Sequence, residues 1–384
     1  MQHPVQIEGL SPQAQRILDP GAPMPARMMA ASGMAPLPPK ELISVLYALS
    51  YGTDTAIGDK ARATLNGLPP NVLLDTISGP LHPAVLDGVA AILISREDAM
   101  ERIVLNRATA PESIVAITRK VTSERILEII FANEKRLLEH PEIIETLYHN
   151  RHARMSSVDR AVELAIRNGI TLKGIAAFDE VKKALEGELI FEPTEEPTPD
   201  DLGFQEAVKI AEENELDTDA MEDTLDAMEK ADEAAVNEAA VSDELKKKAA
   251  TLSASLSEMT ISQKIRAATL GNASQRSVLI RDANKLVIMA VLKSPGVNDS
   301  EVRRYSMLKS LPEEAVRFIA NKREWTKQYS VKLNLVSNPR TPVEYALRFM
   351  THLRANDLRS IERSKDVPGV VRNAAIELRR KRSK

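Results

Sequence analysis

Three polar side chains near the middle of the chain have a spacing that could hold a metal ion. Glu145, His149 and His152 would share one face of a helix, and carboxylate and imidazole groups are common zinc ligands. Both histidines fall at the expected end of that helix, beside Asn150 and Arg151. A histidine there more often interacts with the last carbonyl groups or faces solvent. We therefore expect no metal site and no cofactor.

A second group combines positive charge with the only tryptophan of the chain. Trp325 is surrounded by basic side chains, namely Lys322, Arg323, Lys327 and Lys332. One interpretation is a surface that contacts phosphates and stacks bases. The other is that Trp325 anchors the core, because buried aromatic side chains dominate core energetics, and that the basic residues form its solvated face. We favour the second interpretation for Trp325, and the basic side chains are available for binding under either.

Further basic candidates lie towards the end of the chain. Arg340 follows an Asn-Pro turn, and the last segment carries Arg379, Arg380, Lys381 and Arg382. A basic segment at the end of a helix can complement the helix dipole. It can equally contact phosphates or anionic lipid, so both interpretations stay open.

Several enzyme motifs are missing from the sequence. There is no Gly-x-x-x-x-Gly-Lys loop, no Gly-x-Gly-x-x-Gly and no Gly-x-Ser-x-Gly. The absence of cysteine excludes disulfides and thiolate metal sites and favours a reducing compartment. We recognise no secretory signal, and the apolar runs are shorter than the ~20 residues that a membrane-spanning helix needs. We expect a cytoplasmic protein that is not an enzyme and has no transmembrane segment.

The elements that would position these residues are helices separated by short turns. Asn338 can adopt the left-handed conformation that ends a helix, and Pro339 cannot continue one. Thr341 and Glu344 have the Thr-x-x-Glu spacing of a capping box, and Pro342 suits the first helical position. The sequence therefore predicts a helix that begins near residue 342.

The same turn residues recur and indicate an internal duplication. Thr109 and Glu112 repeat the capping-box spacing, and Ser294–Glu301 is a looser version. The intervals 106–150 and 294–338 both span 44 residues, with an Ala-Asn pair ending 27 residues into each. At an offset of 188 residues the two intervals match at Ala132/Ala320, Asn133/Asn321, Leu147/Leu335 and Asn150/Asn338. We interpret this as a duplication of helical repeats with about three helices per 44 residues.

Hydrophobic spacing predicts an all-α fold. Apolar residues recur at three- and four-residue intervals, and Gly, Pro or Asn stands at each break. In the first half the expected helices lie near residues 39–50 and 54–66, then after Pro70 with Val72, Leu73, Leu74 and Ile77, and then near 82–95, 96–105, 110–120, 123–132, 134–149, 156–168 and 176–186. In the second half they lie near 261–270, 274–280, 283–292, 299–308, 312–320, 323–336, 342–353, 356–362 and 368–382.

This pattern resembles that of HEAT/armadillo-like α-solenoid repeat proteins. The turn residues are also similar to those of uncharacterised bacterial proteins with two helical-repeat halves around an acidic linker. The resemblance covers residues 37–186 and 255–384. It implies irregular stacks of helices with extended binding surfaces, and it assigns no catalytic residue.

Charge and composition divide the chain into segments. Residues 186–248 carry 22 acidic and 5 basic residues, whereas residues 255–384 carry 26 basic and 12 acidic residues. The first residues are rich in Pro, Met and Ala without a sustained period. We expect a disordered arm at 1–36, an N-terminal helical-repeat domain at 37–186, an acidic and partly helical linker at 187–254, and a basic C-terminal helical-repeat domain at 255–384.

Two functions are compatible with this organisation. The first is a non-enzymatic scaffold that binds a protein partner on its helical surfaces, with the basic domain masked by the acidic linker. The alternative is binding of nucleic acid or another polyanion by the basic C-terminal domain. Basic residues along one face would favour nucleic acid, and scattered basic residues would favour the scaffold. The sequence leaves the oligomeric state open.

Overall fold

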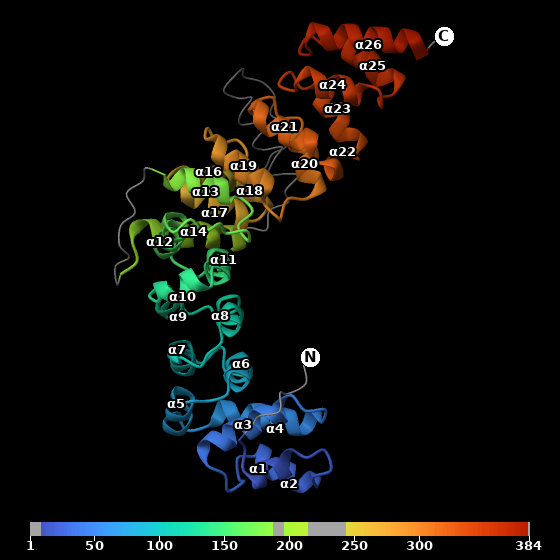
Figure 1. The fold of residues 1–384 in the computed structure, drawn as a ribbon. Helices are drawn as coiled ribbons and strands as arrows, with labels where there is room; N and C mark the ends of the chain where they lie inside the picture. The colour runs from blue at the N-terminus through green and yellow to red at the C-terminus, as the bar shows by residue number, and fades with distance from the viewer. Residues whose placement is uncertain (1–8, 187–195, 214–242, 383–384) are drawn as a thin grey trace. The chain divides into compact units, whose positions relative to one another are not determined.

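The computed structural model describes residues 9–186, 196–213 and 243–382. Over these residues every regular element is an α-helix, which confirms the predicted all-α fold (Figure 1). The chain forms two compact units, Met1–Gly174 and Ile175–Lys384. Each unit has its own buried apolar core.

The first unit stacks its helices in two rows. One row contains α3 (Pro39–Ser50), α5 (Pro70–Ser78), α7 (Glu97–Leu105), α9 (Glu124–Phe131) and α12 (Met155–Arg167). The other contains α4 (Thr55–Gly67), α6 (Pro83–Ile92), α8 (Pro111–Thr118) and α11 (Glu142–His149). The short α10 (Glu134–Glu139) packs against α11 and α12. Figure 1 shows α5, α7 and α9 in one row and α6, α8 and α11 in the other.

The repeating unit is a pair of helices. Successive helices of the first row begin 27 to 31 residues apart. The sequence predicted about three helices per 44 residues, and this period is wrong. Asn106 ends a helix of one row and Asn150 ends a helix of the other, so the 44-residue interval joins different rows.

The second unit has the same construction. Over the described residues its helices are α13 (Phe178–Leu185), α14 (Pro199–Glu213), α16 (Asp243–Ser257), α17 (Ile261–Leu270), α18 (Ala273–Leu279), α19 (Lys285–Lys293), α20 (Asp299–Tyr305), α21 (Glu313–Asn321), α22 (Arg323–Thr326), α23 (Tyr329–Ser337), α24 (Val343–Met350), α25 (Ala355–Arg363) and α26 (Gly369–Arg382). One row follows α17, α19 and α21 and ends with α24 and α26. The other includes α20, α23 and α25.

The match in helix order between the two units extends beyond the intervals that the sequence indicated. The helices from α4 to α12 are matched in order by those from α16 to α24, and paired helices begin 187 to 191 residues apart. Buried side chains coincide as well, as at Ile103/Val291, Leu147/Leu335 and Val162/Met350. We call residues 55–167 the first copy and residues 243–355 the second copy. The predicted equivalence of 106–150 and 294–338 is confirmed in helix order and forms part of this larger repeat.

The predicted disordered arm contains two packed helices over its described residues. These are α1 (Pro12–Leu18) and α2 (Met24–Ala31), which pack against α3, and α2 also packs against α4. The hydroxyl of Ser11 accepts a hydrogen bond from the N–H of Ala14 and donates one to Glu41 at 2.5 Å. Ala30 and Ala31 are fully buried, and their small side chains let α2 pack closely against its neighbours. The two helices are short, and much of their buried surface is alanine, so no sustained pattern of large apolar residues predicted them.

The helix α13, which was expected to end the N-terminal domain, lies against α17 and α19, and Lys293 Nζ is 2.8 Å from both carboxylate oxygens of Glu180. The described parts of the expected linker at 187–254 are also packed. The helix α14 lies against α16 and α17, with Phe204 buried beneath the guanidinium of Arg266. The expected domain border at residue 186 therefore differs from the division after Gly174.

Three local predictions about helix ends and the expected lengths of two helices need correction. The cap of α24 is Pro342, and the Thr341 hydroxyl makes no capping hydrogen bond. Thr109 donates to the carbonyl of Ile103 and caps no helix. Asn338 has an extended backbone, with φ −83° and ψ 123°. The expected long helices at 134–149 and 323–336 are each divided in two, the first beside Pro141, which cannot donate a backbone hydrogen bond.

Candidate functional site

Two asparagines hold corresponding turns in the two copies. The side-chain amide of Asn150 donates to the carbonyls of Thr118 and Val121, at 2.7 and 2.9 Å. The amide of Asn338 donates to those of Ser306 and Leu308, at 3.3 and 2.9 Å. Each asparagine thus ties the end of its helix to the end of the preceding helix in the same row. These buried hydrogen bonds satisfy carbonyl groups that a helix end leaves without intrahelical partners.

A polar cleft of about 430 Å³ lies at the helices that precede and follow the Asn338 turn in the second copy. We call it the basic cleft, and its lining residues are Ala320, Asn321, Arg323, Thr326, Lys332, Arg348, Phe349 and His352. The structure therefore brings together two predicted site residues, Arg323 and Lys332. Arg348 and His352, which the sequence analysis missed, line the same cleft. In the described part of the chain no carboxylate lines this cleft.

Arg348 is held in place at the wall of the basic cleft. Its guanidinium donates to the carbonyl of Ala320 at 3.1 Å and lies 4.9 and 4.8 Å from the ring centres of Tyr345 and Phe349. Stacking on aromatic faces suits the planar guanidinium. Because a guanidinium has five N–H donors, this carbonyl leaves donors available for a ligand.

The other residues of the predicted basic run lie outside the basic cleft. Lys322 Nζ is 4.1 Å from the centre of the Trp325 ring and 5.6 Å from that of Phe318. Trp325 is only 5% exposed, which confirms its predicted role as a core anchor. Lys327 is exposed beside the cleft residue Thr326. A buried tryptophan under a lysine offers no free face for base stacking.

Arg340 and the basic tail also lie outside the basic cleft. The backbone N–H of Arg340 donates to the side-chain oxygen of Asn338 at 3.0 Å, and its side chain is exposed. Arg379 Nε lies 3.1 Å from Glu362, and Arg382 donates to the carbonyl of Leu353 at 2.5 Å. Arg380, Lys381 and Arg382 are exposed, whereas Arg379 is half-buried. Two of the four tail residues thus hold α26 against neighbouring helices.

The residues considered as metal ligands hold a loop. Glu145 Oε1 accepts the backbone N–H of Gly174 at 2.7 Å, and His149 Nε2 lies 3.0 Å from the carbonyl oxygen of the same glycine. His152 is exposed, and its backbone N–H donates to Asn150. Over the residues that the structure describes, no group of three or more His, Cys, Asp or Glu side chains could hold a metal ion.

One phenol near the second row has a perturbed pKa. Tyr329 donates to a carboxylate oxygen of Asp357 and accepts the backbone N–H of Arg354 at 2.9 Å. Burial raises the pKa of the Tyr329 hydroxyl above its ordinary value, and the hydrogen bond to Asp357 raises that pKa further. The phenol therefore remains a neutral hydrogen-bond donor between α23 and α25.

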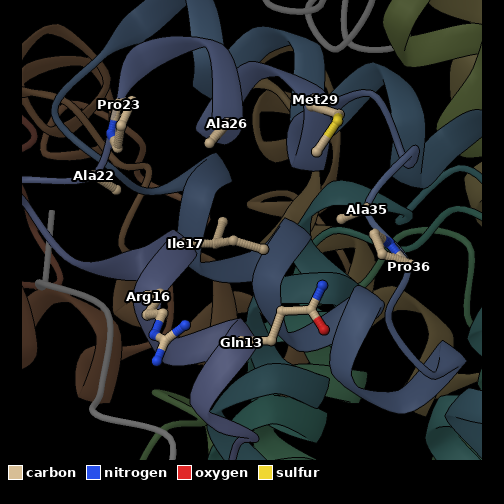
Figure 2. Close-up of a pocket in the computed structure, with 9 residues that line it drawn as sticks. All are labelled: Gln13, Arg16, Ile17, Ala22, Pro23, Ala26, Met29, Ala35 and Pro36. Carbon is tan, nitrogen blue, oxygen red and sulfur yellow. The ribbon is translucent and has the colours of Figure 1, made fainter.

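A smaller and mainly apolar hollow lies near the start of the first unit. Figure 2 shows its lining from α1, α2 and the segment before α3, with Ile17 at its centre and Ala26 and Met29 nearby. Its volume is about 220 Å³. Met24 and Met34 are among the exposed large apolar side chains of this region. The hollow was missed from the sequence because these residues were expected to be disordered.

Side chains at the same positions in the first copy have a different chemistry. Arg160 and Asn133 correspond to Arg348 and Asn321, so these two residue types are retained. Three cleft residues replace apolar residues at the positions offset by 188: Thr326 for Leu138, Lys332 for Ile144 and His352 for Leu164. The offset of 188 was the sequence signal that could have identified Arg348 and His352.

Two acidic residues near this place in the first copy are replaced by lysines in the second, whereas Arg136 is replaced by Glu324. Glu134 lies 3.4 Å from Arg160, and Glu139 lies 3.8 Å from Lys135. The corresponding positions in the second copy carry Lys322 and Lys327. Opposite charges thus balance in the first copy, whereas positive charges accumulate in and around the basic cleft.

Comparison of the chain with models of protein families, with curated proteins and with solved structures found no match. Among the described helices, none is long and apolar enough to cross a bilayer.

Proposed function

We propose that the chain is a non-enzymatic scaffold of the HEAT/armadillo-like kind, which binds an acidic segment of a partner protein in the basic cleft. The observation that carries this proposal is the charge difference between the two copies. Arg323, Lys332 and Arg348 meet in one cleft without a carboxylate in its lining. At the equivalent place the first copy has ion pairs and apolar side chains.

Lys332 supports a binding role because its position is part of the core in the first copy. Ile144, at the corresponding position, is 1% exposed. Lys332 is half-buried and lines the basic cleft. Replacing a buried isoleucine by a lysine sacrifices apolar burial, and a partly buried charge is costly unless it is paired. A bound anion would supply the missing pairing.

A protein partner fits the basic residues of the second unit better than nucleic acid does. Many of these residues have structural partners: Arg276 pairs with buried Glu301, and Lys293 pairs with Glu180. These pairs reduce the number of basic side chains that could follow a phosphate backbone. The buried position of Trp325 also removes the expected stacking surface.

Binding of two labelled probes to the full chain tests this proposal. The probes are a short polyglutamate peptide and a single-stranded oligonucleotide of similar charge, each followed by fluorescence anisotropy at ~50 mM salt, where ionic contacts are strong. We expect the peptide to bind and the variant Lys332→Ile to bind it about tenfold more weakly.

The matched control is Lys135→Ala in the first copy, which should bind like the unchanged chain. Tighter binding of the oligonucleotide than of the peptide would favour the alternative function, a nucleic-acid-binding protein. If neither probe binds, the basic cleft is not a binding site for acidic segments.

A further inference from the structure

We infer that the basic cleft recognises a phosphorylated side chain of the partner protein. This inference rests on the proposed function, since it specifies which anionic group of the partner enters the cleft. The recognition is non-covalent, so no bond forms or breaks. Four features of the cleft carry the inference: its positive charges, its neutral donors, the fixed guanidinium of Arg348 and its surroundings.

The positive charge of the basic cleft exceeds what one carboxylate can balance. Arg323, Lys332 and Arg348 each carry a positive charge at neutral pH. A carboxylate brings a single negative charge and two oxygens. A phosphomonoester carries roughly 1.5 to 2 negative charges near pH 7 and has three strong acceptor oxygens. It can therefore accept charge-assisted hydrogen bonds from several of these side chains together.

Neutral donors in the cleft suit the same ligand. Asn321 has an amide with two N–H donors, and the imidazole of His352 has a donor in either tautomer. The hydroxyl of Thr326 already donates to the backbone carbonyl of Lys322 at 3.2 Å, so it is left as an acceptor. The cleft thus offers mainly donors, which favours a ligand group composed of acceptor oxygens.

The guanidinium of Arg348 is prepared for a phosphate group. Its contacts with Tyr345, Phe349 and the Ala320 carbonyl fix its position before a ligand arrives. A fixed guanidinium loses little conformational freedom on binding. Preorganised arginines are typical of sites that bind phosphorylated side chains.

The surroundings of the cleft indicate what lies next to the phosphorylated residue. Lys322 and Lys327 flank the cleft at positions where the first copy has Glu134 and Glu139. These lysines would attract acidic residues on either side of the phosphorylated one. The two glutamates of the first copy would instead repel a phosphate, so only the second copy should bind it.

Three labelled peptides that differ at one position test the inference with the full chain. The central residue is serine, glutamate or phosphoserine, and glutamates flank it in each peptide. Fluorescence anisotropy should show that the phosphoserine peptide binds at least about tenfold more tightly than the glutamate peptide. Inorganic phosphate should displace the phosphoserine peptide.

Two variants separate recognition of phosphate from general charge attraction. Lys332→Ile and His352→Leu each introduce the residue of the first copy, and each should reduce the preference for phosphoserine over glutamate. Lys135→Ala is the matched control and should leave all three affinities unchanged. The fluorescence of Trp325 verifies that each second-copy variant is folded.

The outcomes distinguish this inference from the proposed function. Equal binding of the phosphoserine and glutamate peptides overturns the inference and leaves the proposed function standing. If none of the three peptides binds, both fall. A phosphoserine preference that persists in Lys332→Ile and His352→Leu places the phosphate elsewhere and also overturns the inference.

Discussion

The two copies of the repeat share their packing and differ in their surface. Both bury an anchor on the short helix, Leu137 in the first copy and Trp325 in the second. Both tie consecutive helices with a turn asparagine. Around this shared frame, the first copy has balanced ion pairs, and the second has the basic cleft.

This difference separates what the fold requires from what binding requires. Many positions that pack between helices are apolar in both copies, as at Leu147 and Leu335, whereas the buried Ile144 of the first copy is replaced by Lys332 in the second. Three positions that changed from apolar to polar or basic, those of Thr326, Lys332 and His352, line the basic cleft, and other such changes, as from Val121 to Lys309, lie elsewhere. Under the proposed function, a few substitutions, one of them at a position that is buried in the first copy, create a binding site on a retained helical frame.

The largest expected effect is a difference in the free energy of unfolding between two fragments of the chain that begin at different residues. A fragment of residues 175–384 keeps α13, whereas a fragment of residues 195–384 loses it and exposes the sites of Phe178, Val181 and Leu185 on the second unit. We expect the shorter fragment to be less stable by roughly 5 kcal/mol, because each of these side chains contributes ~1.5–3 kcal/mol on burial. Urea unfolding followed by Trp325 fluorescence measures the difference, and equal midpoints would show that α13 is not part of the second core.

The turn asparagines should act on their own units. Replacing Asn150 or Asn338 by alanine leaves buried carbonyls without donors, which costs ~1–3 kcal/mol per unsatisfied group. The chain has one tryptophan, and it lies in the second unit. Asn338→Ala should lower the midpoint of the Trp325 unfolding curve. A shift of similar size in Asn150→Ala would mean that the units do not unfold separately.

The acidic segment should compete for the basic cleft of the second copy. Residues 214–242 carry ten acidic residues and one basic residue and lie outside the described residues. Deletion of residues 214–242 should strengthen polyglutamate binding at low salt. The expected factor is only about two to five, because exposed ion pairs contribute ~0–1 kcal/mol each. An isothermal titration of the deleted and full chains checks this. Unchanged affinity would mean that the acidic segment serves another purpose, such as solubility.

The smallest expected effect is a dependence of stability on alkaline pH that is specific to the second copy. The first copy has Pro141 where the second has Tyr329, whose pKa is raised by burial and by its hydrogen bond to Asp357. A raised folded-state pKa contributes stability below the unfolded value of about 10, and this contribution is lost as the pH rises through the folded-state pKa. The second unit should therefore lose some stability at alkaline pH. In the variant Tyr329→Phe this loss of stability should be smaller. Identical slopes of stability against pH would contradict the role of this phenol.

Much of the frame was predictable from the sequence. Turn residues such as Asn150 and Asn338 and the offset of 188 predicted paired repeats, because helix ends need particular residues. The number of helices per repeat was not predictable in the same way. The asparagines mark helix ends in both rows, and a sequence does not show which row a helix joins.

The basic cleft was predictable only in part. Arg323 and Lys332 were identified by their charge, but so were Arg379 and Arg382, which serve packing. Arg348 and His352 were missed because they lie on another helix or just after it, and single charges along a helix have no periodic signal. The capping hydroxyl predicted at Thr341 failed because the following proline itself takes the cap position.

The central claim is that the charge reversal in the second copy creates the binding site. One variant tests it by restoring the residues of the first copy: Lys322→Glu, Lys327→Glu, Lys332→Ile and His352→Leu together. The measurement is the dissociation constant of the polyglutamate peptide for this variant and for the unchanged chain. The fluorescence of Trp325 verifies that both are folded. We predict that the variant loses at least about a hundredfold in affinity, since opposing charges replace attracting ones at the cleft. An unchanged dissociation constant would contradict the claim.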